Sequence, residues 1–141
     1  MVEQFLLEIR GQALYAEQLG MHSVWIGEHH FNRRGCVPVP GLTLANIAAS
    51  TSRIRLGPAV VVLNIHHPIQ VAEEWGALDQ LSGGRLTVNI VPGGSTEDQK
   101  RYGDHLDHDE RYERASEFLD AARAFWQKPG ERVNFRGKYF V

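Results

Sequence analysis

Apolar residues in the middle of the chain follow patterns that predict a strand, a helix and a second strand. Residues 54–63 form a nearly unbroken run of β-branched and aliphatic side chains, which is typical of a strand covered on both faces. Residues 68–82 instead repeat apolar side chains at steps of three and four, which predicts a helix with one buried stripe. That stripe consists of Ile69, Ala72, Trp75, Leu78 and Leu81. Gly83 and Gly84 are expected to end this helix, and residues 86–91 form the next apolar strand.

The segments before residue 54 show the same alternation of helix and strand. A helix is predicted over residues 3–19, a short buried strand over residues 23–27 and a second helix over residues 43–50. Glycines and prolines over residues 35–41 predict an irregular loop before that second helix. Since each strand is followed by a helix, the sheet is expected to be parallel.

The last third of the chain is predicted to hold a polar loop, one long helix and a short tail. Residues 92–107 are mostly polar, and such loops on α/β domains are often functional. Asp107 and Glu110 have the spacing of a capping box and open a helix that runs through residue 127. Its apolar face is expected to contain Tyr112, Ala115, Phe118, Leu119, Ala122, Phe125 and Trp126. Residues 131–141 alternate and predict a hairpin or an edge strand.

This element order indicates an α/β fold with a parallel sheet, either an open doubly wound sheet or part of a TIM (β/α)8 barrel. A complete barrel takes about 250 residues, whereas this chain has 141. If the fold is a barrel, the chain is therefore roughly its front half, and it begins with a helix because the first strand is missing.

Composition excludes several classes of function. The chain is 43% hydrophobic and 23% charged with a formal charge of −2, and it has no basic stripe that would indicate a nucleic acid partner. No apolar run reaches the roughly 18 residues that a membrane helix needs. Cys36 is the single cysteine and cannot form an internal disulfide, so we expect a reducing, cytoplasmic location.

Titratable side chains gather where the predicted strands end. Six of the seven histidines follow a strand: His29, His30, His66, His67, His105 and His108. In parallel α/β folds, chemistry sits beyond the carboxyl ends of the strands. These histidines, with nearby carboxylates such as Glu28, therefore mark a candidate site.

Three interpretations of this concentration remain open. Each histidine can have a purely structural role, as a cap or a backbone partner. A metal site is the second interpretation, although neighbouring histidines on one strand point to opposite faces and no HxH or HExxH pattern is present, so no metal ligands are assigned. The third is a pocket for an organic cofactor, in which a histidine transfers protons.

Four segments together resemble one known family. They are WIGEHHF at residues 25–31, RIRLGPAVVVL at residues 53–63, HHPIQVAEEWGALDQLSGGRL at residues 66–86 and LDHDERYERASEFLDAARAFW at residues 106–126. The chain resembles the luciferase-like, flavin-dependent monooxygenases over nearly its whole length. The first segments are most similar to bacterial luciferase, and the last segment and the NFRGKYF tail to alkanesulfonate and nitrilotriacetate monooxygenases.

The resemblance implies a fold, a cofactor and a reaction. It implies that residues 1–141 are a single partial (β/α)8 barrel domain that binds reduced FMN, or in some branches the deazaflavin F420. In the FMN branches a partner flavin reductase supplies the reduced cofactor, and the flavin peroxide formed with O2 oxygenates a small organic substrate such as a sulfonate or an aldehyde. A homo-oligomer is also expected.

The first part of the implied site lies around the ends of two predicted strands. By resemblance, His29 matches the luciferase histidine in acid/base chemistry near the flavin, and Glu28 matches an acidic position beside the flavin. Ala59 and Val60 match the step at which luciferase has a non-prolyl cis peptide bond. The resemblance therefore places a catalytic group and cofactor-binding backbone in this region.

The second part of the implied site begins the long helix. By resemblance, His108 and Tyr112 match the HxxxY pair that contacts FMN in the nitrilotriacetate branch. Pro92 departs from the family pattern, because the sulfonate and nitrilotriacetate branches usually carry threonine there, and proline offers neither a hydroxyl nor an N–H.

Two other classes of function stay open at this level. A partial barrel exposes unpaired strand edges, so the chain could be a non-catalytic remnant or a self-associating half-barrel. The clustered histidines also leave a metal-dependent hydrolase as a candidate.

Overall fold

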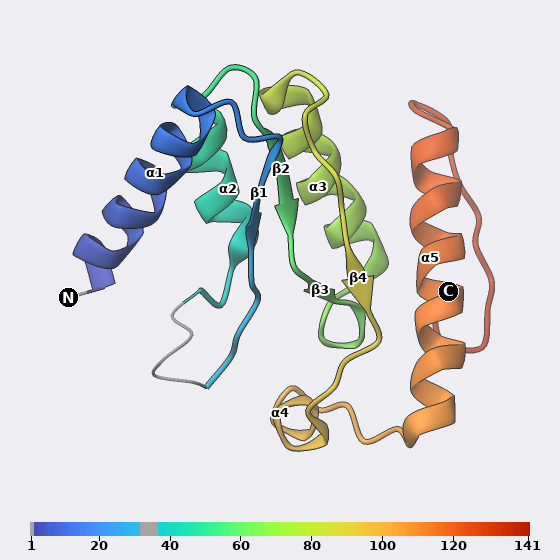
Figure 1. The fold of residues 1–141 in the computed structure, drawn as a ribbon. Helices are drawn as coiled ribbons and strands as arrows, with labels where there is room; N and C mark the ends of the chain where they lie inside the picture. Colours follow the sequence, from blue (N-terminus) through green and yellow to red (C-terminus); the bar gives the residue numbers. More distant parts are fainter. Residues whose placement is uncertain (1, 32–36) are drawn as a thin grey trace. The chain divides into compact units, whose positions relative to one another are not determined.

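The computed structural model of the protein describes residues 2–31 and 37–141, so Gly35 and Cys36, at the start of the predicted loop, lie outside the described residues. In chain order the elements are α1 (Val2–Gln18), β1 (Ser23–Ile26), α2 (Pro40–Ala48), β2 (Arg55–Pro58), β3 (Val61–Val62), the 3-10 turn η1 (Leu63–Ile65), α3 (Pro68–Ser82), β4 (Ile90–Val91), α4 (Thr96–Arg101) and α5 (His108–Gln127) (Figure 1). They form two compact units: unit 1 is Met1–Val61 with Ala77–Asn89, and unit 2 is Val62–Gly76 with Ile90–Val141.

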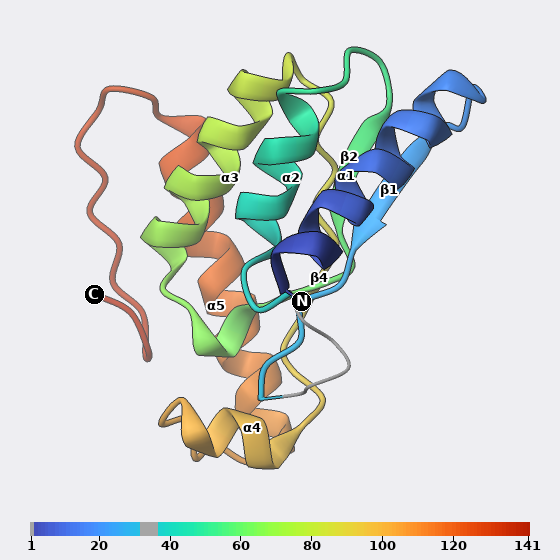
Figure 2. The ribbon, with the colours of Figure 1, turned by 90° about the vertical axis from the view of Figure 1, so that its left-hand side faces the viewer.

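Unit 1 is built on a parallel sheet, as the sequence predicts. β1 and β2 pair in parallel with Ser23 opposite Arg55. Leu56 then pairs in parallel with Leu86, and its N–H donates to the Arg85 carbonyl at 3.0 Å. Helices α1 and α2 lie on one face of β1 and β2, and α2 buries Leu44 and Ile47 completely there (Figure 2). The α/β class is therefore confirmed.

The predicted continuous strand over residues 54–63 is wrong. The chain extends as β2, passes through a cis peptide bond at Ala59–Val60 and resumes as the two-residue β3 before a 3-10 turn. Ala59 donates its N–H to Ile26 at 2.7 Å, but Val61 donates to Asn89 at 2.8 Å, so the chain changes neighbours at this step. The apolar run correctly predicted that most of this segment is buried. Burial alone does not require one uninterrupted strand.

Two predicted boundaries also shift. The helix expected over residues 43–50 begins at Pro40, which fits the first helical position because its missing N–H has no helical partner to lose. The strand expected over residues 86–91 is regular only at Ile90–Val91, although residues 85–89 already carry backbone bonds to their parallel neighbours.

Helix α3 has the predicted bounds, but its buried stripe is partly different. Ala72, Trp75 and Leu78 are buried as expected, whereas Ile69 is 36% and Leu81 is 77% exposed. Val71 is buried instead. Residues 71, 75 and 78 follow one another at steps of four and three, so they lie on the same face of the helix. The two glycines after the helix have φ values of +70° and +78°, which confirms the left-handed ending.

Unit 1 is tied together by a carboxylate that accepts three backbone N–H groups. Oxygens of Glu17 on α1 accept from Ser52 at 2.9 Å, from Arg53 at 2.6 Å and from Ile54 at 2.9 Å. These bonds, the one from Ile54 first, lower the pKa of Glu17 from 4.5 to about 2. The ionised carboxylate therefore holds the turn before β2 against α1.

Arg85 ties the end of α3 to the other helix and strand of unit 1. Its guanidinium donates to the carbonyl oxygens of Ser82 at 2.6 Å, Ala48 at 2.9 Å and Ile54 at 3.1 Å. It also donates to the hydroxyl and the carbonyl of Thr51. One planar fork thus satisfies five acceptors that the ends of helices and a strand leave open.

In unit 2, α4 lies within the segment that was predicted to be an irregular loop. The Ser95 hydroxyl caps it by accepting from the Asp98 N–H at 3.2 Å, and acidic residues fill its first turn while basic residues fill its last. The helix is polar along most of its length, so hydrophobic periodicity did not indicate it.

Helix α5 begins with the predicted capping box of Asp107 and Glu110. Ala115, Phe118 and Ala122 are buried as expected, together with Ala121. Tyr112 and Trp126 were placed on the same apolar face but are 57% and 45% exposed. The Trp126 indole instead donates to the Ala72 carbonyl at 2.9 Å.

The tail after α5 is not the predicted hairpin or edge strand. Its residues return to α5, where the carboxylate of Glu117 accepts the backbone N–H groups of Lys138, Tyr139 and Phe140 at 2.7 to 2.8 Å. Burial raises the pKa of Glu117, but these three bonds outweigh it and the net pKa is lowered. Across residues 2–31 and 37–141, every helix is too short or too polar to span a lipid bilayer.

Candidate active site

One candidate site lies within unit 1, at the end of β1. The imidazole of His29 lies against Gly27, where a Cβ atom would come within 3.2 Å of Nε2 and 3.6 Å of the Ala59 carbonyl oxygen. The His29 backbone N–H donates to the Val37 carbonyl at 3.0 Å, which fixes the position of the residue after the strand. The structure therefore brings His29 next to the cis Ala59–Val60 step, and leaves the His29 side chain exposed.

Glu28 and His30 form a second contact in the same turn. Oε1 of Glu28 lies 2.7 Å from Nε2 of His30, and the Glu28 side chain is only 1% exposed. A buried carboxylate normally needs such a partner, so this contact explains why Glu28 is tolerated in the interior. Of the three consecutive polar residues, His29 is the one that faces outward.

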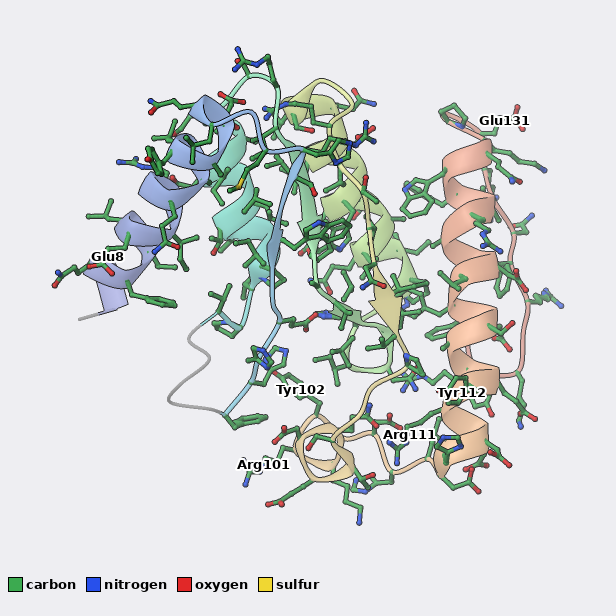
Figure 3. The ribbon with its side chains drawn as sticks, in the orientation of Figure 1. Glu8, Arg101, Tyr102, Arg111, Tyr112 and Glu131 are labelled. Atoms are coloured by element: carbon green, nitrogen blue, oxygen red, sulfur yellow. The ribbon has the colours of Figure 1, made fainter. Side chains whose placement is uncertain are left out.

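A separate candidate surface, within unit 2, is an aromatic pair at the start of α5. The rings of His108 and Tyr112 are 5.0 Å apart between centroids and tilted by 45°. Nδ1 of His108 lies 2.9 Å from Asp109, and the tyrosine ring is mostly exposed (Figure 3). The HxxxY spacing thus produces one exposed surface with an imidazole and a phenol hydroxyl, because positions one helical turn apart share a face.

A buried polar network holds this aromatic pair, and sequence analysis did not assign it. Arg111 is 8% exposed and donates to the Leu106 carbonyl at 3.1 Å and to the Thr96 hydroxyl at 2.9 Å. Asn64, which is 2% exposed, donates to the Arg111 carbonyl at 3.1 Å, and Arg114 donates to the Asn64 carbonyl at 3.0 Å. The first turn of α5 is therefore fixed to α4 and η1 within unit 2 (Figure 3).

A sequence signal for this network existed in the spacing of Arg111. Arg111 follows the capping residue Asp107 by four positions, and its side chain points about 100° away from that of the exposed Tyr112. Sequence analysis made no prediction for Arg111, because a long charged side chain in the first turns of a helix is usually exposed to solvent.

His67 has partners that give it a structural role. The His67 ring contacts Phe140 edge to face at 5.9 Å, and its Nδ1 accepts the Ile69 N–H at 3.3 Å near the start of α3. Within the part of the chain that the structure describes, no three His, Cys, Asp or Glu side chains converge on a position that could hold a metal ion.

Comparison with known proteins identifies the family. The family model described as luciferase-like monooxygenase matches residues 3–141. The chain is 34% identical over 112 residues to the oxygenase component of a flavin-dependent trigonelline monooxygenase from Acinetobacter baylyi, an alignment that covers 79% of this chain and 31% of that protein. The chain belongs to the luciferase-like monooxygenase family, and the resemblance found in its sequence is confirmed.

Solved structures confirm the fold. A monooxygenase from Streptomyces bottropensis superposes with a TM-score of 0.90 at 31% identity, covering 99% of this chain and 41% of that one. The oxygenating constituent of 3,6-diketocamphane monooxygenase from Pseudomonas putida, solved with FMN, gives a TM-score of 0.91 at 25% identity over 99% of this chain and 38% of that one. The chain therefore has the fold of part of a TIM-barrel monooxygenase, and it spans about a third of the length of the curated relatives it matches.

Proposed function

We propose that this chain is part of an FMN-dependent monooxygenase that transfers one oxygen atom from O2 to a small organic substrate. The observation that supports this most directly is the exposed His29 imidazole beside Gly27 and the Ala59 carbonyl, in a chain that the luciferase-like monooxygenase model matches over residues 3–141. Reduced FMN, when bound, supplies the two electrons that reduce the second oxygen atom to water. The substrate class is a sulfonate or an aldehyde.

The residues on the chain fit a flavin. Flavins need hydrogen-bond partners and flat contact surfaces, and the exposed rings of His108 and Tyr112 offer both. Within unit 1, Gly27 leaves room for the His29 ring, which a side chain at position 27 would push away. We assign cofactor contact to His108, Tyr112 and the Ala59–Val60 backbone, with buried Glu28 supporting the turn that carries His29.

His29 has the chemistry of an acid/base group. Its imidazole is exposed to a ligand, and its position is set by the backbone bond to Val37. An imidazole so placed can donate a hydrogen bond to the reacting oxygen and return a proton to it. His29 is therefore the proposed catalytic residue.

The reduced cofactor is proposed to come from a separate flavin reductase. The Acinetobacter relative is named as an oxygenase component, which supports a two-component system. FMN is proposed rather than F420 because the neighbour solved with FMN has a TM-score of 0.91 at 25% identity, whereas an F420-dependent secondary alcohol dehydrogenase solved with an F420 adduct has 0.83 at 20%. A homo-oligomer remains a prediction of the sequence.

The role of His29 can be tested in a complete barrel. Replacing the matched part of the Streptomyces bottropensis monooxygenase with residues 1–141 gives a chimera that contains His29 and the remaining strands. We expect His29→Ala to reduce oxygenation by that chimera about 100-fold or more while FMN affinity changes less than about threefold. A folded, flavin-loaded chimera that keeps full turnover after this substitution would remove His29 from the mechanism.

A further inference from the structure

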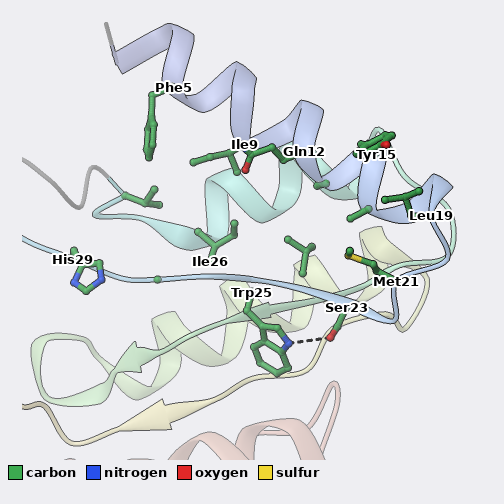
Figure 4. A pocket seen from close by; sticks show the side chains of 15 residues that line it. Phe5, Ile9, Gln12, Tyr15, Leu19, Met21, Ser23, Trp25, Ile26 and His29 are labelled. Carbon is green, nitrogen blue, oxygen red and sulfur yellow. Dashed lines mark hydrogen bonds between the residues drawn. The ribbon is translucent and has the colours of Figure 1, made fainter.

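Two pockets of the structure differ in the charge of the side chains that line them. The pocket between α1 and β1 in unit 1 has a volume of about 740 Å³, and none of the described residues around it is Asp, Glu, Lys or Arg (Figure 4). A second pocket, of about 590 Å³, lies in unit 2, in the tail after α5. It is lined by Arg132, Val133, Asn134, Phe135, Arg136 and Val141. Two of these side chains are cations and none is Asp or Glu, so this pocket is positively charged.

The two arginines lie on the same side of the tail. Val133 and Phe135 are half-buried, whereas Arg132, Asn134 and Arg136 are exposed. This alternation is that of an extended segment, in which every second residue faces the same way. The Cα atoms of Arg132 and Arg136 are then roughly 13 Å apart. The Asn134 amide lies between them, so both long side chains can converge on one ligand beside it.

Neither guanidinium group has a partner within the protein. Arg132 and Arg136 form no hydrogen bond or ion pair with another residue of the ranges 2–31 and 37–141. Glu113 and Glu117 on α5 bind the end of the tail instead. Glu131 does not line the pocket. Two like charges on one pocket repel each other, so a ligand that brings negative charge is favoured there.

The donors of this pocket suit an oxyanion. A guanidinium group presents a planar fork of N–H donors that matches two oxygens of a phosphate group. The backbone N–H groups of residues 132–136 also form no bond with any part of the chain that the structure describes. Backbone N–H groups left open in a loop add to an anion site.

We propose that Arg132, Asn134 and Arg136 bind a phosphate monoester. The two guanidinium groups match the two negative charges of such a group, and the Asn134 amide donates to a further oxygen. This site does not rest on the proposed monooxygenase function, because none of its residues is assigned to the flavin or to acid/base chemistry.

The proposal predicts saturable binding of methyl phosphate to the 141-residue protein. Methyl phosphate carries nearly two negative charges at about pH 8, because the second pKa of such groups is about 6. We expect an NMR titration to shift the Asn134 side-chain amide and the Nε–H signals of Arg132 and Arg136 to saturation. Acetate at the same ionic strength carries one charge and is expected to bind at least tenfold more weakly.

A matched set of charge removals locates the site. Arg132→Gln and Arg136→Gln each remove one guanidinium group and are expected to weaken methyl phosphate binding at least fivefold. Arg123→Gln removes the same charge from an exposed position of α5 that does not line the pocket, and should change the affinity less than twofold. All three side chains are exposed, so the substitutions should leave the fold intact.

FMN contains the same phosphate group, and competition separates the two sources. Displacement of bound methyl phosphate by FMN, but not by riboflavin, would show that the phosphate of the flavin occupies the site. A site that FMN does not enter belongs to a different phosphate monoester.

Three results would overturn the proposal. Methyl phosphate could leave the Asn134 signal unshifted. Acetate could bind as tightly as methyl phosphate, which would show only screening of surface charge. Finally, Arg123→Gln could weaken binding as much as both pocket variants do, which would assign the effect to the general positive charge of the region instead of to a site.

Discussion

The imidazole of His29 occupies the space that a side chain on Gly27 would need, because a Cβ atom there would lie 3.2 Å from Nε2. A half-buried glycine directly after β1 thus leaves the room in which the proposed acid/base group lies. This relationship explains why a residue without a side chain is found directly before the Glu-His-His sequence.

Gly27→Ala should therefore move the His29 ring without unfolding the protein. In the chimeric complete barrel we expect oxygenation to fall by about tenfold to a hundredfold, since small displacements of a catalytic group have large effects. The imidazole NMR resonances of His29 should shift as well. Gly11→Ala is the control: nothing lies within 4 Å of its added Cβ, and the helical site should gain roughly 0.5–1 kcal/mol of stability.

Glu17 predicts how the stability of the protein depends on pH. Its pKa is lowered from 4.5 to about 2 in the folded state. A depressed folded pKa means that the carboxylate stabilises the fold above the unfolded value, and that this contribution is lost as the pH falls from 4.5 toward 2. Urea denaturation at about pH 7 and about pH 3 should show a smaller pH effect in Glu17→Gln than in the wild type.

Glu8→Gln provides the comparison for Glu17, because Glu8 lies on the same helix and accepts a bond from the Gln4 side chain of that helix. Its pH dependence should match that of the wild type. Equal pH dependence in Glu17→Gln and the wild type would show that the three backbone bonds do not hold the turn before β2.

The guanidinium of Arg85 should be difficult to replace. Arg85→Ala leaves the carbonyls of Ala48, Ile54 and Ser82 without this donor and is expected to lower the free energy of unfolding by about 2 kcal/mol or more. Lysine should restore little of this loss, because an ammonium group lacks the planar fork. Chemical denaturation tests this in Arg85→Ala and Arg85→Lys. Arg55→Ala is the control, because Arg55 is exposed and its replacement should change the free energy of unfolding by less than about 0.5 kcal/mol.

The tail of the chain is expected to contribute to the stability of unit 2 through Phe140. This ring is 9% exposed and packs edge to face on Phe118 at 5.7 Å, with the Arg114 guanidinium 5.5 Å from its centroid. Phe140→Ala should cost about 3 kcal/mol. Val141→Ala is the control, because Val141 is fully exposed and its replacement should have almost no effect on stability. Thermal unfolding measures both variants. Equal stabilities of Phe140→Ala and Val141→Ala would show that the tail does not pack on α5.

Helices were predicted better than strands for a physical reason. The capping box at Asp107 and the glycines after α3 are local signals, so the bounds of both long helices were correct. The strand around Ala59 is interrupted where the backbone N–H of Ala59 bonds to one neighbouring segment and that of Val61 bonds to another. The pattern of apolar residues does not indicate such a change of partner. Exposure was also misjudged at Tyr112, because helical spacing fixes which residues share a face and does not fix which face is buried.

The site was predictable only as far as the family motifs extend. The HxxxY spacing places His108 and Tyr112 one helical turn apart, and their ring centroids lie 5.0 Å apart. Their contact with FMN stays a prediction. The contact of His29 with Gly27 and the network around Arg111 depend on tertiary packing that the chain order does not reveal.

The most direct test of this account is an anaerobic titration of the 141-residue protein with oxidised and reduced FMN, followed by fluorescence and calorimetry. Saturable binding of one flavin per chain, weakened at least tenfold in His108→Ala, is the predicted result. Wild-type protein that is folded by circular dichroism but binds neither form of FMN would contradict the assignment of a flavin site to these residues.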